Sequence, residues 1–267
     1  MKFCTINNLY HIGLAIMTEH IPSAAILVIG NEILSGRTQD TNTKFIAEKM
    51  TSLGIRMREV RVVPDDKDII IAALNEMRAK VDYLFTTGGI GPTHDDITAG
   101  SIAEAFGVDL ILDPDARRQM LDYYGAEAEL TEARLRMAHV PQGAALIRNP
   151  VSGAPGFIMG NVYTMAGVPR IMQAMMDNIV ATLRQGPKIM SNSISCSLGE
   201  SAIAHQLGEI QNRYPDVEIG SYPHYRAGAL GLSLVLRSID QQKIAAATEE
   251  VIAMVKSLNG NPVLLTG

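Results

Sequence analysis

A short, unbroken apolar run at 24–30, AAILVIG, is the feature that most restricts the fold. A strand that is apolar on every residue is covered on both faces, which is typical of a parallel sheet between two layers of helices. Two further strands are predicted at 55–63 and 83–87, and helical patterns at 40–53 and 65–77 fill the intervals. This alternation of strands and helices with short loops predicts a doubly wound, mostly parallel sheet.

Local signals place the ends of several elements. Asp40 and Asp65 each precede a helical pattern, and we predict that each caps its helix. A further helix is expected near 96–106, and the chain then changes rhythm, with two surface helices at 113–124 and 131–138. A strand at 162–165 and a helix at 168–183 complete this part.

The segment Gln185-Gly186-Pro187 is the best domain boundary. Beyond it the pattern is strand, helix, strand, strand, helix, which predicts a small C-terminal α+β domain. Before residue 23 the chain is nearly uncharged and is broken by polar residues, so we interpret it as a dispensable extension or an ordered helix. The predicted organisation is an N-terminal extension at 1–22, an α/β domain at 23–185 and a small αβ domain at 186–267.

Charge and cysteine content exclude several classes of protein. Lys and Arg total 23 against 28 Asp and Glu, a net charge of −5, which argues against a nucleic-acid-binding protein. Two cysteines cannot form a disulfide framework, so we expect a cytoplasmic location. No run of about 18 apolar residues occurs, so no membrane association is expected. Any bound phosphate must be held locally, by backbone N–H groups, a metal or a few cations.

The glycine loop TTGGIGPTHDD at 86–96 is the strongest functional signal. It lies where a strand ends and a helix begins, at the edge where open α/β sheets bind ligands. Gly88, Gly89 and Gly91 allow the backbone to approach a ligand closely and to offer N–H groups to a phosphate, and Thr93 follows them. The helix N-terminus adds the positive end of a dipole. The spacing matches neither a dinucleotide fingerprint nor a P-loop.

Two adjacent carboxylates, Asp95 and Asp96, follow the glycines. Beside a phosphate they would repel it unless a divalent metal lay between, and Mg²⁺ bridging carboxylates and phosphates is the expected arrangement. The simpler interpretation is that one aspartate caps the helix. That interpretation leaves the second aspartate and the glycines unexplained, so we favour a metal site.

Two other loops contain candidate ligand contacts. Glu32 follows the first strand at the same edge of the sheet and can face the same pocket as a ligand or base, although Asn31 and Gly36 also fit an ordinary turn. The glycine- and proline-rich turn at 149–156 offers backbone donors, and we include Ser152 and Gly153 among the candidate phosphate contacts. Such turns are more often structural.

These loops together resemble the molybdenum-cofactor biosynthesis (MoCF, molybdopterin-binding-like) domain family. TTGGIGPTHDDIT is most similar to the N-terminal domain of competence/damage-inducible protein A (CinA) and of eukaryotic FAD synthases, over about 24–183. The tail, with VEIGSYP at 217–223, resembles the small domain that follows there. The resemblance implies a three-layer α/β/α sandwich of the MogA/MoaB type and a homo-oligomer.

The resemblance also implies an activity. CinA-type relatives are implied to be metal-dependent pyrophosphatases that act on ADP-ribose or FAD-like dinucleotides with Mg, Mn or Co. Asp95 and Asp96 would hold the metal and, with Glu32, carry catalysis. Gly88, Gly89, Gly91 and Thr93 would cradle phosphate. Asn42 would also contact phosphate and would join Glu32 in the pocket. His94 stands where a lysine is common in that family, which makes one phosphate contact weaker or dependent on pH.

Two other functions remain open. Mog- and MoaB-type relatives bind molybdopterin or transfer an adenylyl group to it, which requires a pterin partner. A non-catalytic regulatory module would hold a nucleotide as a signal. All three readings share a phosphorylated small molecule, a dinucleotide or a pterin, as the ligand.

Overall fold

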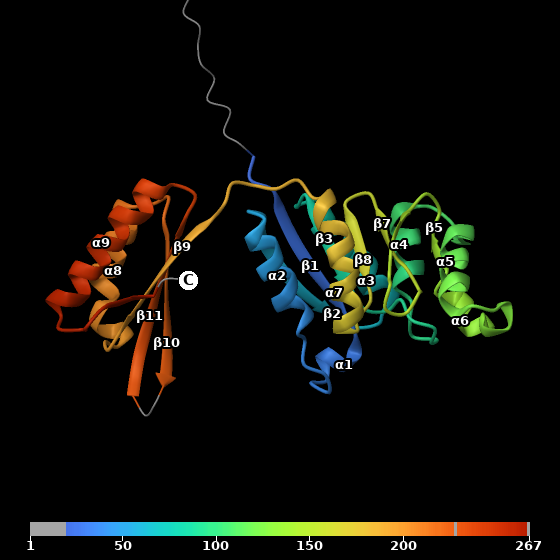
Figure 1. Ribbon diagram of the computed structural model, residues 1–267, viewed down its shortest axis with the longest axis horizontal. Coiled ribbons are helices and arrows are strands. Elements are labelled where there is room, and N and C mark those ends of the chain that lie inside the picture. Colours follow the sequence, from blue (N-terminus) through green and yellow to red (C-terminus); the bar gives the residue numbers. More distant parts are fainter. Residues whose placement is uncertain (1–19, 227–228, 266–267) are drawn as a thin grey trace, which may run out of the picture.

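The computed structural model describes residues 20–226 and 229–265, in two folded units (Figure 1). The predicted extension at 1–22 therefore lies almost entirely outside the described residues. No helix among the described residues is long and apolar enough to cross a bilayer.

The larger unit is built on a six-stranded sheet with the order β2-β1-β3-β8-β7-β6. Strands β2, β1, β3 and β8 are parallel, whereas β7 pairs antiparallel with both β8 and β6. The fold is thus the predicted mostly parallel sheet. The strands are β1 (Ser23–Ile29), β2 (Arg56–Val63), β3 (Tyr83–Thr87), β6 (Ala145–Ile147), β7 (Gly156–Met159) and β8 (Val162–Met165).

Helices cover both faces of this sheet, which confirms the three-layer sandwich (Figure 1). On one face lie α2 (Asn42–Ser52) and α7 (Pro169–Ile179), which pack the side chains of Ile46 and Met176 against Phe85. On the other face lie α3 (Lys67–Arg78) and α4 (Thr98–Phe106). The short helix α1 (Asn31–Leu34) follows β1.

Both predicted helix starts are displaced by one residue. Thr41, not Asp40, occupies the N-cap position of α2, although the Asp40 carboxylate accepts the Asn42 N–H at 2.9 Å. Asp66, not Asp65, caps α3, accepting the Ile69 N–H at 3.1 Å. Asp65 instead accepts the Asn31 N–H at 2.9 Å, across the carboxyl ends of β2 and β1. Two adjacent aspartates fit the same capping pattern, so the sequence alone cannot choose between them.

A small insert follows α4 and has a core of its own. It contains β4 (Leu110–Leu112), α5 (Pro114–Tyr124), the 3-10 turn η1 (Glu127–Glu129), α6 (Glu132–Arg136) and β5 (His139–Pro141). Strands β4 and β5 pair antiparallel, so the two ends of the insert meet. Its core contains Ala116, Met120, Leu130 and Ala138. The two predicted surface helices correspond to α5 and α6, whereas the pairing of β4 with β5 was not predicted.

The smaller unit has a four-stranded antiparallel sheet with the order β10-β11-β9-β12, packed on two helices. The predicted order is confirmed, and the buried Cys196 ends β9. The three-residue strand β12, which follows Asn-Gly-Asn-Pro, was not predicted. The elements are β9 (Met190–Cys196), α8 (Glu200–Arg213), β10 (Glu218–Arg226), β11 (Ala229–Ser238), α9 (Gln241–Ser257) and β12 (Val263–Leu265).

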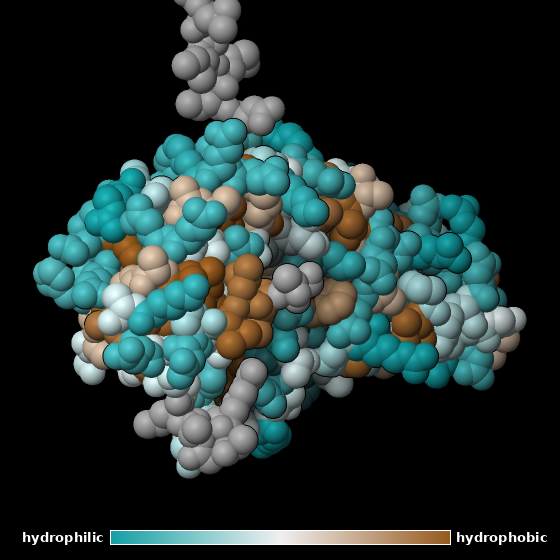
Figure 2. All heavy atoms as spheres, turned by 60° about the vertical axis from the view of Figure 1, so that its left-hand side comes forward, coloured by the Kyte–Doolittle hydropathy of each residue, from teal (hydrophilic) through white to brown (hydrophobic). Residues whose placement is uncertain are grey.

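Figure 2 shows brown apolar side chains among a mostly teal surface on the side that carries the smaller unit. Exposed apolar residues of this unit include Tyr222, Ile239, Val263 and Leu264. Apolar surface of this kind is common at protein interfaces. The expected homo-oligomer stays a prediction.

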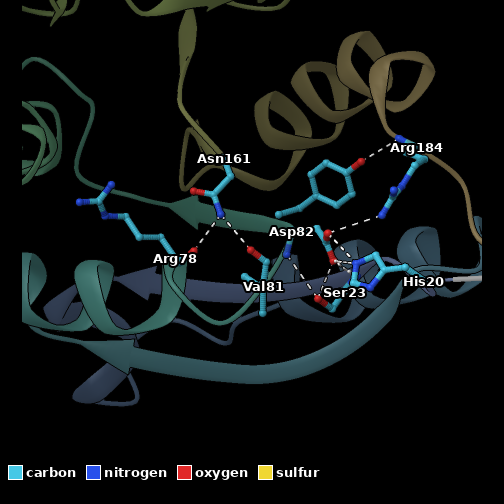
Figure 3. Close-up of polar contacts among 8 residues, drawn as sticks. His20, Ser23, Arg78, Val81, Asp82, Asn161 and Arg184 are labelled. Carbon is cyan, nitrogen blue, oxygen red and sulfur yellow. Dashed lines mark hydrogen bonds and ion pairs between the residues drawn. The ribbon is translucent and has the colours of Figure 1, made fainter.

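Asp82 ties three segments together at the amino end of β3 (Figure 3). Its carboxylate accepts hydrogen bonds from the Ser23 hydroxyl at 2.8 Å and from His20 Nε2 at 2.9 Å, and the Arg184 guanidinium lies 3.5 Å away. The Arg184 N–H donates to the Tyr83 hydroxyl at 2.8 Å. The start of the linker between the two units is therefore fixed to the larger sheet.

The Asp82 cluster predicts a pH-dependent contribution to stability. Burial raises the pKa of the Asp82 carboxyl, but hydrogen bonds from His20 and Ser23 outweigh it and lower the pKa to about 2. The ionised form therefore stabilises the fold above about pH 4, and this contribution is lost as the pH falls toward 2. We expect Asp82→Asn to lower the free energy of unfolding by about 1 kcal/mol at pH 7, allowing for partial exposure, and by about half of that at pH 3. Urea unfolding of both proteins at several pH values measures this, and a difference independent of pH would contradict it.

Candidate functional site

The glycine loop begins directly after β3, and its backbone requires glycine. Gly88 and Gly89 have φ angles of +101° and +67°, in the left-handed region that other residues avoid. A Cβ atom on Gly88 would lie 2.1 Å from the backbone oxygen of Ile29 on the neighbouring strand. The Thr98 hydroxyl donates to the Gly88 carbonyl at 3.0 Å, which fixes the loop to the start of α4.

Three consecutive N–H groups of this loop face no protein acceptor. The Gly88 N–H donates to the Met165 carbonyl at 3.2 Å. Among residues 20–226 and 229–265, no acceptor bonds the N–H groups of Gly89, Ile90 or Gly91. Successive free N–H groups in such a turn form a concave site for an anion. The predicted cradle of Gly88, Gly89 and Gly91 thus has the donors that a phosphate needs, although Gly88 contributes backbone shape and not a free donor.

Asp95 and Asp96 do not cap the following helix, which begins at Thr98 with Ile97 at its N-cap position. Both carboxylates instead accept from one hydroxyl, that of Thr93, at 2.6 Å each. Asp96 also accepts the Thr93 N–H at 2.8 Å and lies against Gly91, where a Cβ atom would be 2.6 Å from its oxygen. The simpler capping interpretation is therefore wrong. Thr93 positions the carboxylates, so its own polar groups are not free for phosphate.

The donor set at Asp95 and Asp96 fits a hard divalent cation. The Thr93 hydroxyl has a single proton, so it can donate a hydrogen bond to only one of the two carboxylates at a time. The hydrogen bond from Thr93 lowers the pKa of the Asp95 carboxyl below its ordinary value, which keeps this group ionised at neutral pH. Among the described residues no group of three or more His, Cys, Asp or Glu converges as a complete metal site. A Mg²⁺ ion bound by two carboxylates ordinarily takes its other ligands from phosphates and water.

A cavity of about 290 Å³ opens beside this loop, on the face of the sheet that carries α4. One wall is the loop itself, with Gly91, Thr93, His94 and Asp96, and the opposite wall comes from the insert. This size approaches the lower end of the range for small-molecule sites. The apolar side chains that line it are Ile90, Ala99, Leu110, Met137, Val140, Pro155 and Phe157.

The insert places two nitrogen-bearing side chains in this cavity. The other arginines of α5 and α6, namely Arg117, Arg118 and Arg134, each pair with a carboxylate, whereas Arg136 pairs with none among the described residues. His139 Nδ1 lies 3.0 Å from the Leu135 carbonyl, which requires a proton on Nδ1 and leaves Nε2 available. The cavity thus has the Asp96 carboxylate on one wall and, on the other, a guanidinium without a carboxylate partner among the described residues.

A second cavity, of about 50 Å³, lies on the opposite face of the sheet beside α2 and α7. Glu32, Asn42 and Thr87 line it. The expectation that Glu32 shares a pocket with the glycine loop is therefore wrong for the cavity of Asp96. The reason is topological, since α1 and α2 follow β1 on one face while the loop leads into α4 on the other.

Asn42 has the wrong free atom for its predicted contact with phosphate. Its Nδ2 donates to the Gly167 carbonyl at 2.7 Å, so its Oδ1 must point the other way. That oxygen is buried and has no hydrogen-bond partner among the described residues, and Asn42 is only 6% exposed. A buried acceptor without a donor costs about 1–3 kcal/mol. Asn42 is therefore suited to a donor group, not to phosphate oxygens.

Ser152 and Gly153 form a turn around Asn149 and line neither cavity. The Ser152 hydroxyl accepts from Asn149 Nδ2 at 2.6 Å, and the Gly153 N–H donates to the Asn149 carbonyl at 3.1 Å. A Cβ atom on Gly153 would lie 2.6 Å from the Tyr123 side chain. These contacts favour the structural alternative for both residues, and Pro155 is the residue of this loop that reaches the larger cavity.

Three residues that line these cavities were not predicted as site residues, namely Arg136, His139 and Thr87. No local pattern distinguishes Arg136 from the neighbouring arginines, because pairing with carboxylates is decided by the folded insert. Thr87 could have been found, since it is the last residue of the strand that ends at the glycine loop.

Comparison with known proteins identifies both units. The family model MoCF_biosynth, described as a probable molybdopterin binding domain, matches residues 25–185, and the middle domain of FAD synthase matches residues 188–260. A Pyrobaculum calidifontis protein is 32% identical over 258 residues, covering 90% of this chain and 98% of the relative. A CinA-like protein from Desulfosudis oleivorans is 35% identical over 209 residues, 74% of this chain but 51% of that protein.

Among solved structures, the protein CinA from Thermoplasma acidophilum, whose function is given as unknown, is 38% identical with a TM-score of 0.57. The match covers 60% of this chain and 97% of that one. Fold, glycine loop and family models therefore agree: the chain belongs to the MoCF_biosynth family, with a molybdopterin-binding-like domain of the CinA type followed by a segment that matches the middle domain of FAD synthase.

Proposed function

We propose that the larger domain is a metal-dependent nucleotide pyrophosphatase that acts on ADP-ribose or an FAD-like dinucleotide. The observation that carries this proposal is the convergence of Asp95 and Asp96 on one Thr93 hydroxyl, beside three free N–H groups. Carboxylates beside an anion cradle repel the phosphate that the cradle binds, unless a cation lies between them. A substrate with two linked phosphates supplies oxygens for both the N–H cradle and the cation.

Each group of the site has a role in this reaction. The N–H groups of Gly89, Ile90 and Gly91 bind phosphate oxygens and stabilise the charge that develops on them. A divalent cation held by Asp95 and Asp96 would polarise the phosphate and lower the pKa of an attacking water. The larger cavity takes a ring of the substrate against its apolar side chains, and Arg136 binds the phosphate that lies away from the loop.

The comparisons support a ligand of this class. The match to the middle domain of FAD synthase supports a nucleotide-containing ligand. The net charge of −5 agrees with local recognition of phosphate and not with nucleic-acid binding.

The activity is tested by incubating the purified protein with ADP-ribose or FAD in the presence of Mg²⁺, Mn²⁺ or Co²⁺. We expect AMP to be released with each active metal and no release in EDTA. If AMP appears with none of the metals, or appears equally in EDTA, the proposal is wrong.

Replacing Arg136 tests which wall of the cavity recognises phosphate. We expect Arg136→Ala to weaken binding of ADP-ribose by about 10- to 100-fold, because a charge-assisted contact to phosphate is lost. Binding of adenosine, which has no phosphate, should be unchanged. Calorimetry in Mg²⁺ on adenosine and on the non-hydrolysable α,β-methylene analogue of ADP-ribose measures this. Arg118→Ala is the matched control, since Arg118 lies in the same insert, pairs with Asp115 and does not line the cavity. Equal effects of the two variants would contradict the assignment.

A second candidate function, molybdopterin binding with or without adenylyl transfer, is favoured by the same cavity. Its apolar floor and the free nitrogens of Arg136 and His139 suit a flat pterin ring with an attached phosphate. Tight binding of a phosphorylated pterin, without turnover of any dinucleotide, would favour this function over pyrophosphate hydrolysis.

A further inference from the structure

The smaller cavity differs in chemistry from the phosphate site. Near the sheet it has the unpartnered Asn42 Oδ1, which can only accept, and the hydroxyl of the lining residue Thr87, which can both accept and donate. The orientation of the Asn42 amide is fixed, because Nδ2 is 2.7 Å from a backbone carbonyl. An anion is therefore disfavoured in this cavity, because it would face the acceptor oxygen of Asn42.

A metal ion is also a poor match for the cavity. Asp40 lines it, but its carboxylate is engaged with the N–H groups of Asn42 and Thr43 and with the Thr43 hydroxyl. Glu32 is the other carboxylate and lies exposed at the rim, folded over Gly30. One free carboxylate and one amide oxygen are fewer charged ligands than hard divalent ions ordinarily take from protein.

A hydroxyl group of a ligand can form a hydrogen bond with each of these two side chains. It can donate to the Asn42 Oδ1 and accept from the Thr87 hydroxyl, which is 1% exposed and makes no hydrogen bond among the described residues. A volume of about 50 Å³ suits a hydroxyl-bearing carbon but no aromatic ring. Glu32 at the rim can accept from a neighbouring hydroxyl, as acidic residues do for ribose in nucleotide sites.

The position of this cavity connects it to the phosphate cradle. Thr87 lines the smaller cavity and Ile90 lines the larger one, so Gly88 and Gly89 separate the two. A diphosphate on the glycine loop can thus extend a base-bearing group toward one face of the sheet and a ribose toward the other. We propose that the smaller cavity is a sugar-hydroxyl subsite in which Asn42 and Thr87 recognise a hydroxyl of a phosphorylated ribose.

This inference rests on the proposed nucleotide ligand but not on its hydrolysis, so the test measures binding, in Mg²⁺, of probes that contain no pyrophosphate bond. The probes are AMP, 2′-deoxy-AMP and 3′-deoxy-AMP, together with ribose 5-phosphate and 2-deoxyribose 5-phosphate. We expect one ribose probe to bind about tenfold more tightly than its deoxy counterpart. Calorimetry on the full chain gives the ratio of the two dissociation constants.

Variants then show which residues distinguish the ribose probe from its deoxy counterpart. Thr87→Val and Asn42→Leu should each reduce the ratio to about one, without weakening the deoxy probe. Thr86→Val is the matched control, because Thr86 faces the opposite side of β3 and bonds the Thr164 hydroxyl at 3.1 Å. Thr87→Val removes a hydroxyl without a protein partner from a β-strand, so it should fold even if Asn42→Leu, which deprives the Gly167 carbonyl of its donor, does not.

The outcomes separate this inference from the proposed activity. A ratio that collapses in Thr87→Val but not in Thr86→Val supports the subsite, whether or not AMP is released in the metal assay. Equal binding of ribose and deoxy probes by the unmodified protein, or a ratio that survives Thr87→Val, shows that the cavity holds water only and overturns the proposal. Failure of every probe to bind overturns it as well.

Discussion

We expect Asp96→Asn to lower the metal-dependent release of AMP from ADP-ribose by about 100- to 1,000-fold. The variant removes one of the two charges that would hold the cation and retains nearly the same shape. An asparagine oxygen can still accept the Thr93 N–H, which Asp96 accepts at 2.8 Å, so the loop should keep its conformation. Initial rates across a range of Mn²⁺ concentrations measure the effect.

The metal dependence separates a charge effect from a folding effect. If Asp96 holds the cation, the variant should need a higher Mn²⁺ concentration for half-maximal rate, while its unfolding curve stays close to that of the unmodified protein. Asp68→Asn is the control, because Asp68 is an exposed residue in the first turn of α3 and lines neither cavity. An unchanged rate in Asp96→Asn would remove the central residue of the proposed mechanism.

The largest effect on stability is expected from Gly88→Ala. A side chain at Gly88 requires a φ of +101°, and its Cβ would meet the Ile29 backbone oxygen at 2.1 Å. Strand β1 lies in the middle of the sheet between β2 and β3, so this oxygen cannot move without disturbing the pairing. We expect a loss of at least about 3 kcal/mol, from the left-handed backbone and the overlap together. In a chain of this size the midpoint of thermal unfolding should fall by roughly 6–12 °C.

Gly143→Ala provides the matched control for this prediction. Gly143 also has a positive φ, +85°, but no atom lies within 4 Å of where its Cβ would be. The backbone penalty alone should cost about 1 kcal/mol there. Thermal and urea unfolding of the two variants side by side isolate the steric part at Gly88. Equal losses would show that close packing against β1 does not explain the glycine.

The core of the sheet was predictable because its signals are local. The strands at 83–87 and 162–165 match β3 and β8, and the apolar run at 24–30 matches β1 to within one residue. Burial on both faces imposes continuous apolar sequence, which can be read without knowledge of the neighbours. The glycine loop and the Asp95–Asp96 pair were found for the same reason, since a strand end followed by glycines is a contiguous pattern.

The division of the site into two cavities was not predictable from such patterns. Glu32 and Asp96 both follow strands at one edge of the sheet, but the face on which each lies depends on which side the next helix crosses. Arg136 is available to bind a ligand because the carboxylates of the insert pair with the other arginines. Which atom of the Asn42 amide is left unpaired depends on the carbonyl of Gly167, 125 positions away in the sequence. These are consequences of tertiary contacts between distant segments.

The insert has an evolutionary consequence. Its ends lie side by side, because Leu110 of β4 pairs with Pro141 of β5, and its interior has an apolar core separate from that of the sheet. A segment with adjoining ends and its own core can diverge, or be exchanged between homologues, without disturbing the framework that carries it. Because this segment supplies one wall of the larger cavity while the carboxylates come from the loop after β3, ligand preference can drift while the chemistry is inherited unchanged.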